Sequence, residues 1–217
     1  MAGTRRARIL FAGCAAVLAT ALGATTALAA AGWTIRPGGT ITAKSGTATV
    51  TDTKTGKLFT CTSLSASGTL KTGSGLSGLH AGSISAVAFS RCTNPLGRFR
   101  AQRARIVWTV QAAGLPWHVN LLSDNGGVVR GTISHIQIKA SFVTVCSAVI
   151  DGTSGTAADG TVRFRYTNST GRLTVLATGG NLHAYNVSGC LGLVNNGDPV
   201  TISTTFTLSP KQAITSP

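Results

Sequence analysis

The sequence predicts an all-β protein: an antiparallel β-sandwich, immunoglobulin-like or made of paired sandwich halves, held together by two disulfides. Apolar and polar residues alternate with a period of two in many short stretches, the pattern of strands with one buried face. Turn dipeptides separate these stretches at the short spacing of a sandwich or barrel. Four cysteines follow a candidate export signal, an even number that suits an oxidising compartment. We expect about 10 to 13 strands and no amphipathic helix.

Residues 1–29 have the layout of a secretory signal peptide. Arg5, Arg6 and Arg8 precede an apolar run rich in alanine, and residues 27–29 provide an A-x-A cleavage site. The run contains Ala, Gly and Thr rather than mostly Leu and Ile, so we prefer a cleaved signal to an uncleaved membrane anchor. We therefore expect a secreted protein, extracellular or loosely associated with the cell surface.

The mature chain is expected to form one all-β domain over residues 30–217. A weak internal similarity suggests two pseudo-repeated halves, about 33–115 and 116–210. It rests on residues 78–97 and 180–197, which both contain Leu-His-Ala, then a polar/apolar alternation, then a cysteine. Chance similarity is the alternative, because the chain is built from few residue types.

The clearest strand patterns are three stretches with regular alternation. In residues 162–166, Val, Phe and Tyr alternate with Arg163 and Arg165, so the two arginines should point outward. Residues 136–140 and 202–208 alternate in the same way. The turn signals that punctuate the chain are Pro37-Gly38, Thr55-Gly56, Asn125-Gly126, Asp151-Gly152, Asp159-Gly160, Thr170-Gly171, Gly179-Gly180 and Asn196-Gly197.

Cys61, Cys92, Cys146 and Cys190 should form two disulfides. The sequence allows three pairings, and the internal similarity favours Cys61 with Cys92 and Cys146 with Cys190 without excluding the others. No Cys-x-x-Cys or Cys/His ligand spacing indicates a metal site. Reduction should weaken the fold substantially, because each bridge closes a long loop.

The chain is poor in charge but strongly basic. Charged residues make up 11% of it, against a typical value of about 25%. Without the three arginines of the signal, 16 Lys and Arg oppose 5 Asp, which leaves a net charge of +11. A basic strand face could bind anionic polymers of the cell envelope or surface glycans, and a solvated face without a partner is the alternative. The expected residues of this face are Arg98, Arg100, Arg103, Arg105, Arg163 and Arg165.

Tryptophans indicate a second possible function, the binding of a small apolar or carbohydrate ligand. Trp117 follows a Leu-Pro pair at a strand entrance and is the better candidate, and Trp33 lies close to the expected new N-terminus. Trp108 shares a face with apolar residues and should belong to the core. Core packing of Trp117 is the alternative to ligand binding.

Signals of catalysis are weak. The five aspartates all lie beside turn residues, where they are expected to cap turns. No nucleophile elbow or phosphate-binding loop appears. We expect no enzyme, no cofactor and no metal; histidines would form a metal site only if His80 met His183. An envelope-directed hydrolase or antimicrobial protein is less favoured, and a hydrolase would need Asp151 or Asp159 beside a histidine.

Several short stretches carry a resemblance that spans nearly the whole mature chain. They are WTIRPGG (33–39), GKLFTCTS (56–63), GLPW (114–117), YTNSTG (166–171), GGNLHAYNVSGCLG (179–192) and LSPKQAITSP (208–217). Together they resemble a group of secreted actinobacterial proteins with an all-β mature part. The resemblance implies secretion and an all-β fold, and it assigns no functional residue.

Two further partners are not expected. The basic residues come without a groove-reading helix, so we expect no specific nucleic-acid binding. The tail after residue 210 lacks an apolar stretch, so we expect no membrane anchor there.

Overall fold

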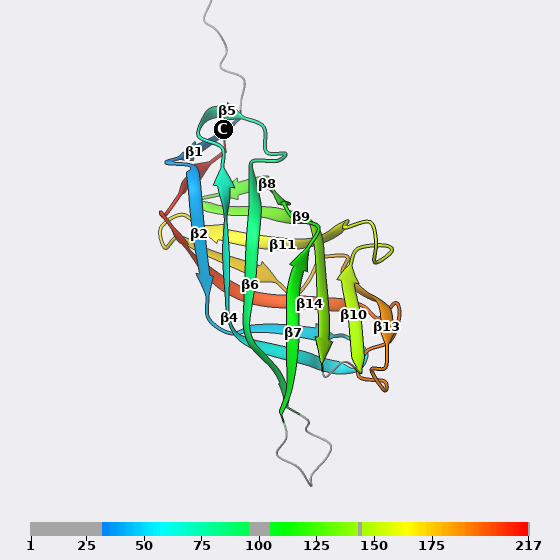
Figure 1. Cartoon of the computed structure of the whole chain (residues 1–217). Helices are drawn as coiled ribbons and strands as arrows, with labels where there is room; N and C mark the ends of the chain where they lie inside the picture. Colours follow the sequence, from blue (N-terminus) through cyan, green and yellow to red (C-terminus); the bar gives the residue numbers. More distant parts are fainter. Residues whose placement is uncertain (1–31, 96–104, 143–144, 217) are drawn as a thin grey trace, which may run out of the picture.

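A computed structural model describes residues 32–95, 105–142 and 145–216 (Figure 1). The proposed signal peptide lies outside these residues. The described residues form fifteen strands, more than the 10 to 13 expected, and no helix, as the alternation predicts. No segment among them is therefore a helix long and apolar enough to cross a membrane. The strands are β1 (Trp33–Arg36), β2 (Gly39–Ser45), β3 (Ala48–Asp52), β4 (Gly56–Leu70), β5 (Gly73–Leu76), β6 (Gly82–Pro95), β7 (Arg105–Ala113), β8 (Trp117–Asn125), β9 (Val128–Phe142), β10 (Cys146–Asp151), β11 (Gly160–Thr167), β12 (Arg172–Leu176), β13 (His183–Ser188), β14 (Val200–Ser209) and β15 (Ala213–Thr215).

The main sheet closes into an eight-stranded barrel, so the predicted sandwich is wrong. The closing contact is the antiparallel pairing of β11 with β9, which runs from Val162 opposite Ile133 to Thr167 opposite Val128 and follows a register shift after Gly160 opposite Ile136. Around the barrel the strands follow as β9, β11, β12, β14, β2 with β3, β4, β6, and β7 with β8. A strand with one buried face shows the same alternation in a sandwich and in a barrel, which is why the sequence could not distinguish them.

Two of the eight barrel strands are each interrupted once. β2 and β3 both pair with β14 and β4 on either side of Gly46-Thr47, so they continue one bent strand. β7 and β8 do the same between β6 and β9, and the interruption contains the cis peptide bond Leu115-Pro116. These bends let long strands follow the curved wall (Figure 1).

The predicted inward and outward faces of the strands are confirmed. Val162, Phe164 and Tyr166 of β11 are buried, whereas Arg163 and Arg165 are exposed. The alternating apolar residues of 136–140 and 202–208 are also buried. Trp108 is buried, as expected, against Phe59 and Phe142, with ring centroids 5.2 and 4.8 Å away.

A small sheet of β5, β1 and β15 caps one end of the barrel. The Tyr166 hydroxyl links the cap to β11, because it donates to the Gln212 carbonyl at 2.8 Å and accepts from the Gln212 N–H at 2.9 Å. Asn168 exchanges two further hydrogen bonds with the backbone of Ile214 in β15. The buried side chain of Ile214 lies at the barrel interior. The cap therefore forms part of the wall around the interior.

Both preferred disulfides are confirmed. Cys61 in β4 pairs with Cys92 directly opposite in β6, with a Cα–Cα distance of 3.8 Å. Cys146 at the start of β10 pairs with Cys190 after β13, at 4.4 Å. β10 and β13 extend the sheet beyond the closed barrel from the second half of β9. Two disulfides fit a protein that works outside the reducing cytoplasm.

Candidate functional site: an apolar cavity in the barrel

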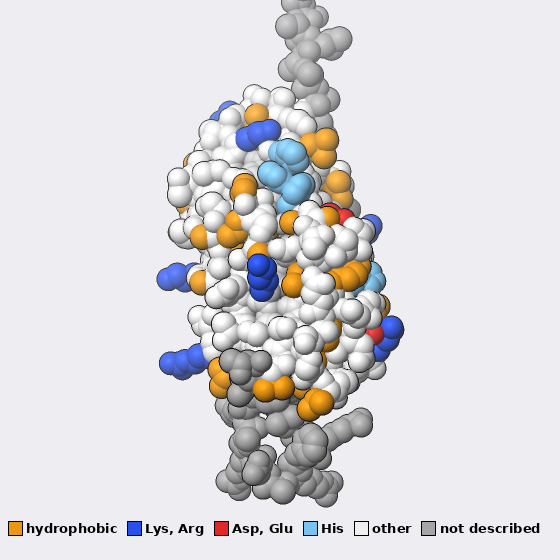
Figure 2. All heavy atoms as spheres, turned by 45° about the vertical axis from the view of Figure 1, so that its right-hand side comes forward, with side chains coloured by type: hydrophobic (Ala, Val, Ile, Leu, Met, Phe, Trp, Pro, Cys, Tyr) orange, Lys and Arg blue, Asp and Glu red, His pale blue; other side chains and the backbone are white. Residues whose placement is uncertain are grey.

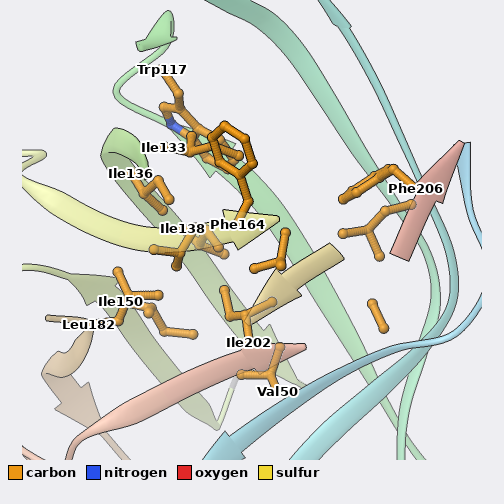
Figure 3. Packing of buried hydrophobic residues seen from close by; sticks show 14 of the residues in the cluster. Val50, Trp117, Ile133, Ile136, Ile138, Ile150, Phe164, Leu182, Ile202 and Phe206 are labelled. Atoms are coloured by element: carbon orange, nitrogen blue, oxygen red, sulfur yellow. The ribbon is translucent and has the colours of Figure 1, made fainter. Parts of the chain in front are cut away.

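The barrel interior contains a cavity of about 100 Å³ whose accessible surface is wholly apolar. Its lining side chains come from the eight barrel strands and from β15 of the cap. Figure 3 shows the side chains of Phe164, Ile138 and Ile202 converging on this interior, with Phe206 on the opposite wall. An apolar surface of this kind favours hydrocarbon over water, because a bound water needs two to four polar partners.

Small side chains on two strands contribute to the cavity wall. Ala43 of β2 and Ala66 and Ser67 of β4 line it, whereas β11 on another wall contributes Phe164 and Tyr166. Protein interiors are normally packed at the density of organic crystals, so a void of this size is unusual. The small side chains at these positions of β2 and β4 leave space that larger residues there would occupy.

Trp117 belongs to the cavity wall. Its indole Nε1 donates a hydrogen bond of 2.9 Å to the Ala113 carbonyl, across the bend that joins β7 to β8. This bond satisfies the polar atom of the ring while the ring lies among the lining residues, 7% exposed. Trp33 is 8% exposed, in the cap. Both indoles are too buried to offer an exposed stacking platform for sugars.

The expected basic face is described only in part. Arg98, Arg100 and Arg103 lie outside the described residues, and only the backbone of Arg105 is described, as the first residue of β7. On the face shown in Figure 2, Lys and Arg side chains stand singly rather than in a stripe.

On the outer barrel wall, the exposed Arg165 of β11 lies directly opposite Arg130 of β9, with exposed Arg163 two residues before it on the same strand. Sequence reasoning missed Arg130, because only the strand pairing brings it to this place.

Three histidines gather on the outer surface, although the sequence suggested only a meeting of His80 with His183. The His80 ring stacks on His118 with centroids 4.3 Å apart, and His135 meets His118 edge-on at 4.6 Å. His183 lies elsewhere, with its Nδ1 2.8 Å from the Asn181 carbonyl. No three metal-ligating side chains converge on one point among the described residues. Positions 80, 118 and 135 share no sequence motif, so only the folded strands reveal this histidine cluster.

The pKa of His118 is lowered from its usual 6.5. Partial burial, which disfavours the charged imidazolium, is the largest cause, and the neighbouring His80 and His135 add to it. Protonation of His118 is therefore disfavoured by burial and by its two histidine neighbours.

The aspartates cap turns, as the sequence predicts. Asp52 accepts from the N–H groups of Lys54 and Thr55, and Asp124 from Gly127. Asp151 is fully buried and accepts from three backbone N–H groups and from Gln137 Nε2. Asp159 accepts from the backbone and hydroxyl of Thr153.

Asp198 accepts from the N–H of Asn195 and forms an ion pair of 2.9 Å with Lys54. The Lys54 contact is the largest cause that lowers its pKa to about 2. Asp151 lies directly opposite His183 in the pairing of β10 with β13, but among the described residues the Asp151 carboxylate bonds to Gln137 and backbone N–H groups, and the His183 ring to the Asn181 carbonyl.

Comparison with known proteins finds no matching family model, no similar curated protein and no similar solved structure. The chemistry of the described residues is therefore the basis for function. Of the features above, the apolar cavity is the one that defines a ligand class.

Proposed function

We propose that this protein binds a small apolar molecule inside its barrel, and that it does so outside the cytoplasm. The observation that carries the proposal is the 100 Å³ cavity with no polar wall. An empty cavity lowers stability by about 24 cal/mol per Å³, so this one forgoes roughly 2 kcal/mol. A single larger side chain on β4 or β2 would fill the cavity and remove this cost. The unfilled cavity therefore favours a bound ligand.

The size and wall of the cavity define the ligand. An apolar cavity of about 150 Å³ takes up benzene or xenon, and drug-sized ligands need about 300 Å³ or more. The expected occupant is a compact hydrocarbon group of about benzene size or smaller. A polar ligand would lose its hydrogen bonds to water without replacement. The two disulfides support action in an oxidising compartment.

The test compares xenon binding in the wild type with a variant in which a larger side chain fills the cavity. Xenon should bind the wild-type protein, detected as a bound signal in ¹²⁹Xe NMR and as density in xenon-pressurised crystals. Ala66→Leu should abolish this signal and keep or raise the melting temperature, because the new side chain occupies the void. Ala88→Leu, on an exposed position of β6, is the matched control and should leave xenon binding intact. Absence of xenon from the wild type, or undiminished uptake by Ala66→Leu, would refute the proposal.

Binding of anionic polymers through the outer wall is a second candidate function. Arg165 and Arg130 occupy directly opposed positions on β11 and β9. Like charges opposite each other destabilise a sheet, and the described residues show no aspartate paired with either arginine. An anion shared by the two guanidinium groups would relieve the repulsion. This observation supports contact with anionic envelope polymers or glycans.

The polymer contact should depend on salt. Retention on immobilised polyphosphate should fall steeply between 50 and 200 mM salt, on the order of tenfold for two or three phosphate contacts. The double variant Arg130→Gln/Arg165→Gln should reduce both the retention and its salt dependence. Lys44→Gln/Lys71→Gln, which removes two exposed positive charges outside β9 and β11, is the control for net charge. Equal retention of the arginine variant and this control would argue against a defined contact at this wall.

A further inference from the structure

The histidine cluster, defined as His80, His118 and His135, lies on a junction between cap and barrel. Figure 2 shows histidine side chains in one pale-blue group on the upper part of the molecule. His118 follows Trp117 in β8, His135 precedes Ile136 in β9, and both of these neighbours line the cavity. His80 lies in the loop that leads from β5 of the cap to β6 of the barrel. The cluster thus connects the cap to the wall of the ligand site.

The loop that carries His80 is clamped between the two parts. The Gly78 carbonyl accepts the Leu121 N–H at 2.8 Å, and the His80 N–H donates to Asn120 Oδ1 at 2.9 Å. A Cβ on Gly78 would lie 2.5 Å from the Leu121 carbonyl oxygen and 2.7 Å from the Nε1 of Trp33 in the cap. The loop therefore touches the cap on one side and β8 on the other, and displacement of the loop would disturb both contacts.

Within the part of the chain that the structure describes, no aspartate forms an ion pair with a member of the cluster. β8 supplies His118, β9 supplies His135 and the loop supplies His80, while β6 places the uncharged Ser83 opposite His118. The charges that act on His118 are those of the other two histidines. Lys71, whose N–H donates to the Ala81 carbonyl next to His80, could add only positive charge. Protonation of the rings would therefore place like charges within a stack.

We propose that protonation of the histidine cluster in mildly acidic conditions releases the loop from β8 and loosens the cap, which opens the barrel cavity. The inference rests on the proposed function, because the opening regulates the entry and release of the apolar ligand. The pH dependence of opening follows from the pKa of His118. This pKa lies below 6.5 in the closed state and returns to the usual 6.5 when the loop is released, so protonation favours the open state. Closure is fully favoured above pH 6.5, and the open state gains as pH falls below it.

The opening is measured without a ligand, by hydrogen exchange of the amides of β1 and β15. After correction for the intrinsic rate, exchange at pH 5 should be at least about fivefold faster than at pH 7.5. This factor corresponds to the repulsion of two unit charges about 4 Å apart in water, which favours the open state. Amides of β11 and β14 should keep their protection. Equal cap protection at both pH values would overturn the proposal.

Neutral substitutions identify the groups responsible. His80 and His135 have φ angles of 49° and 64°, so asparagine, which tolerates this backbone region, replaces them. The variant His80→Asn/His118→Gln/His135→Asn should lose the acid-induced exchange. His183→Asn removes the histidine that lies outside the cluster, and this variant should keep the acid-induced exchange. If the triple variant does not fold, His118→Gln alone should reduce the response. Loss of the response in His183→Asn, or its persistence without the cluster, would contradict the mechanism.

Xenon separates the two proposals. If xenon binds and its exchange into the cavity accelerates at pH 5 in the wild type but not in the cluster variant, both proposals are supported. If the cap opens in acid but xenon does not bind at any pH, the apolar-ligand function fails while the opening stands. If xenon binds with the same exchange rate at both pH values, the cavity function stands and the histidine control of it fails.

Discussion

Replacing Cys61 and Cys92 by alanine should lower the free energy of unfolding by about 3.7 kcal/mol. The bridge spans a sequence separation of 31, and a crosslink of this length removes roughly that much loop entropy from the unfolded chain. The pair Cys146→Ala/Cys190→Ala, with a separation of 44, should lose about 4 kcal/mol by the same reasoning. A small domain with a cavity in its core has little stability in reserve.

Urea denaturation of the two double variants and the wild type measures these losses. The slope of the transition should rise when a bridge is removed, because the unfolded chain becomes more expanded. Ser147→Ala, next to Cys146 and exposed, is a control that should change stability by less than about 0.5 kcal/mol. A loss below about 1 kcal/mol in both double variants would show that the unfolded state is not constrained by these bridges.

The local structure of the strands was predictable from the sequence. Alternation placed Phe164 inside and Arg163 outside, and the turn dipeptides placed the aspartates at caps. These features depend on residues within a few positions of one another. The preferred cysteine pairing was also confirmed, although the internal similarity that favoured it is weak.

Closure of the sheet was not predictable, because it depends on contacts between distant segments. Pairing of Gly160 with Ile136 converts an open sheet into a barrel, and neither residue carries a local signal for it. The cavity is a consequence of this closure, because Ala66 of β4 and Phe164 of β11 line one common interior only when the wall is complete. The histidine cluster was not predictable for the same reason, because the register of β8 and β9 and the loop before β6 bring its members together.

Truncation of Phe164 should both destabilise the protein and change the ligand that it accepts. Phe164 is 1% exposed and lines the cavity, and Phe→Ala changes in such positions cost about 3 to 5 kcal/mol. The variant Phe164→Ala should enlarge the cavity, so that benzene or a larger ring binds more tightly than to the wild type. Added benzene should then restore part of the lost melting temperature, because a ligand that binds only the folded state stabilises it.

Phe59→Ala is the matched control for this experiment. Phe59 is as deeply buried as Phe164, but it packs against Trp108 and is not among the cavity-lining residues. We expect a similar loss of stability, measured by urea denaturation. Calorimetry should show no rise in the affinity of the barrel cavity for benzene. If both variants gain the same affinity, benzene binding reports only on the new hole that each truncation leaves. A gain confined to Phe164→Ala would instead show that the added space joins a cavity the wild-type barrel already has, and the affinity for larger rings would then be set by that residue.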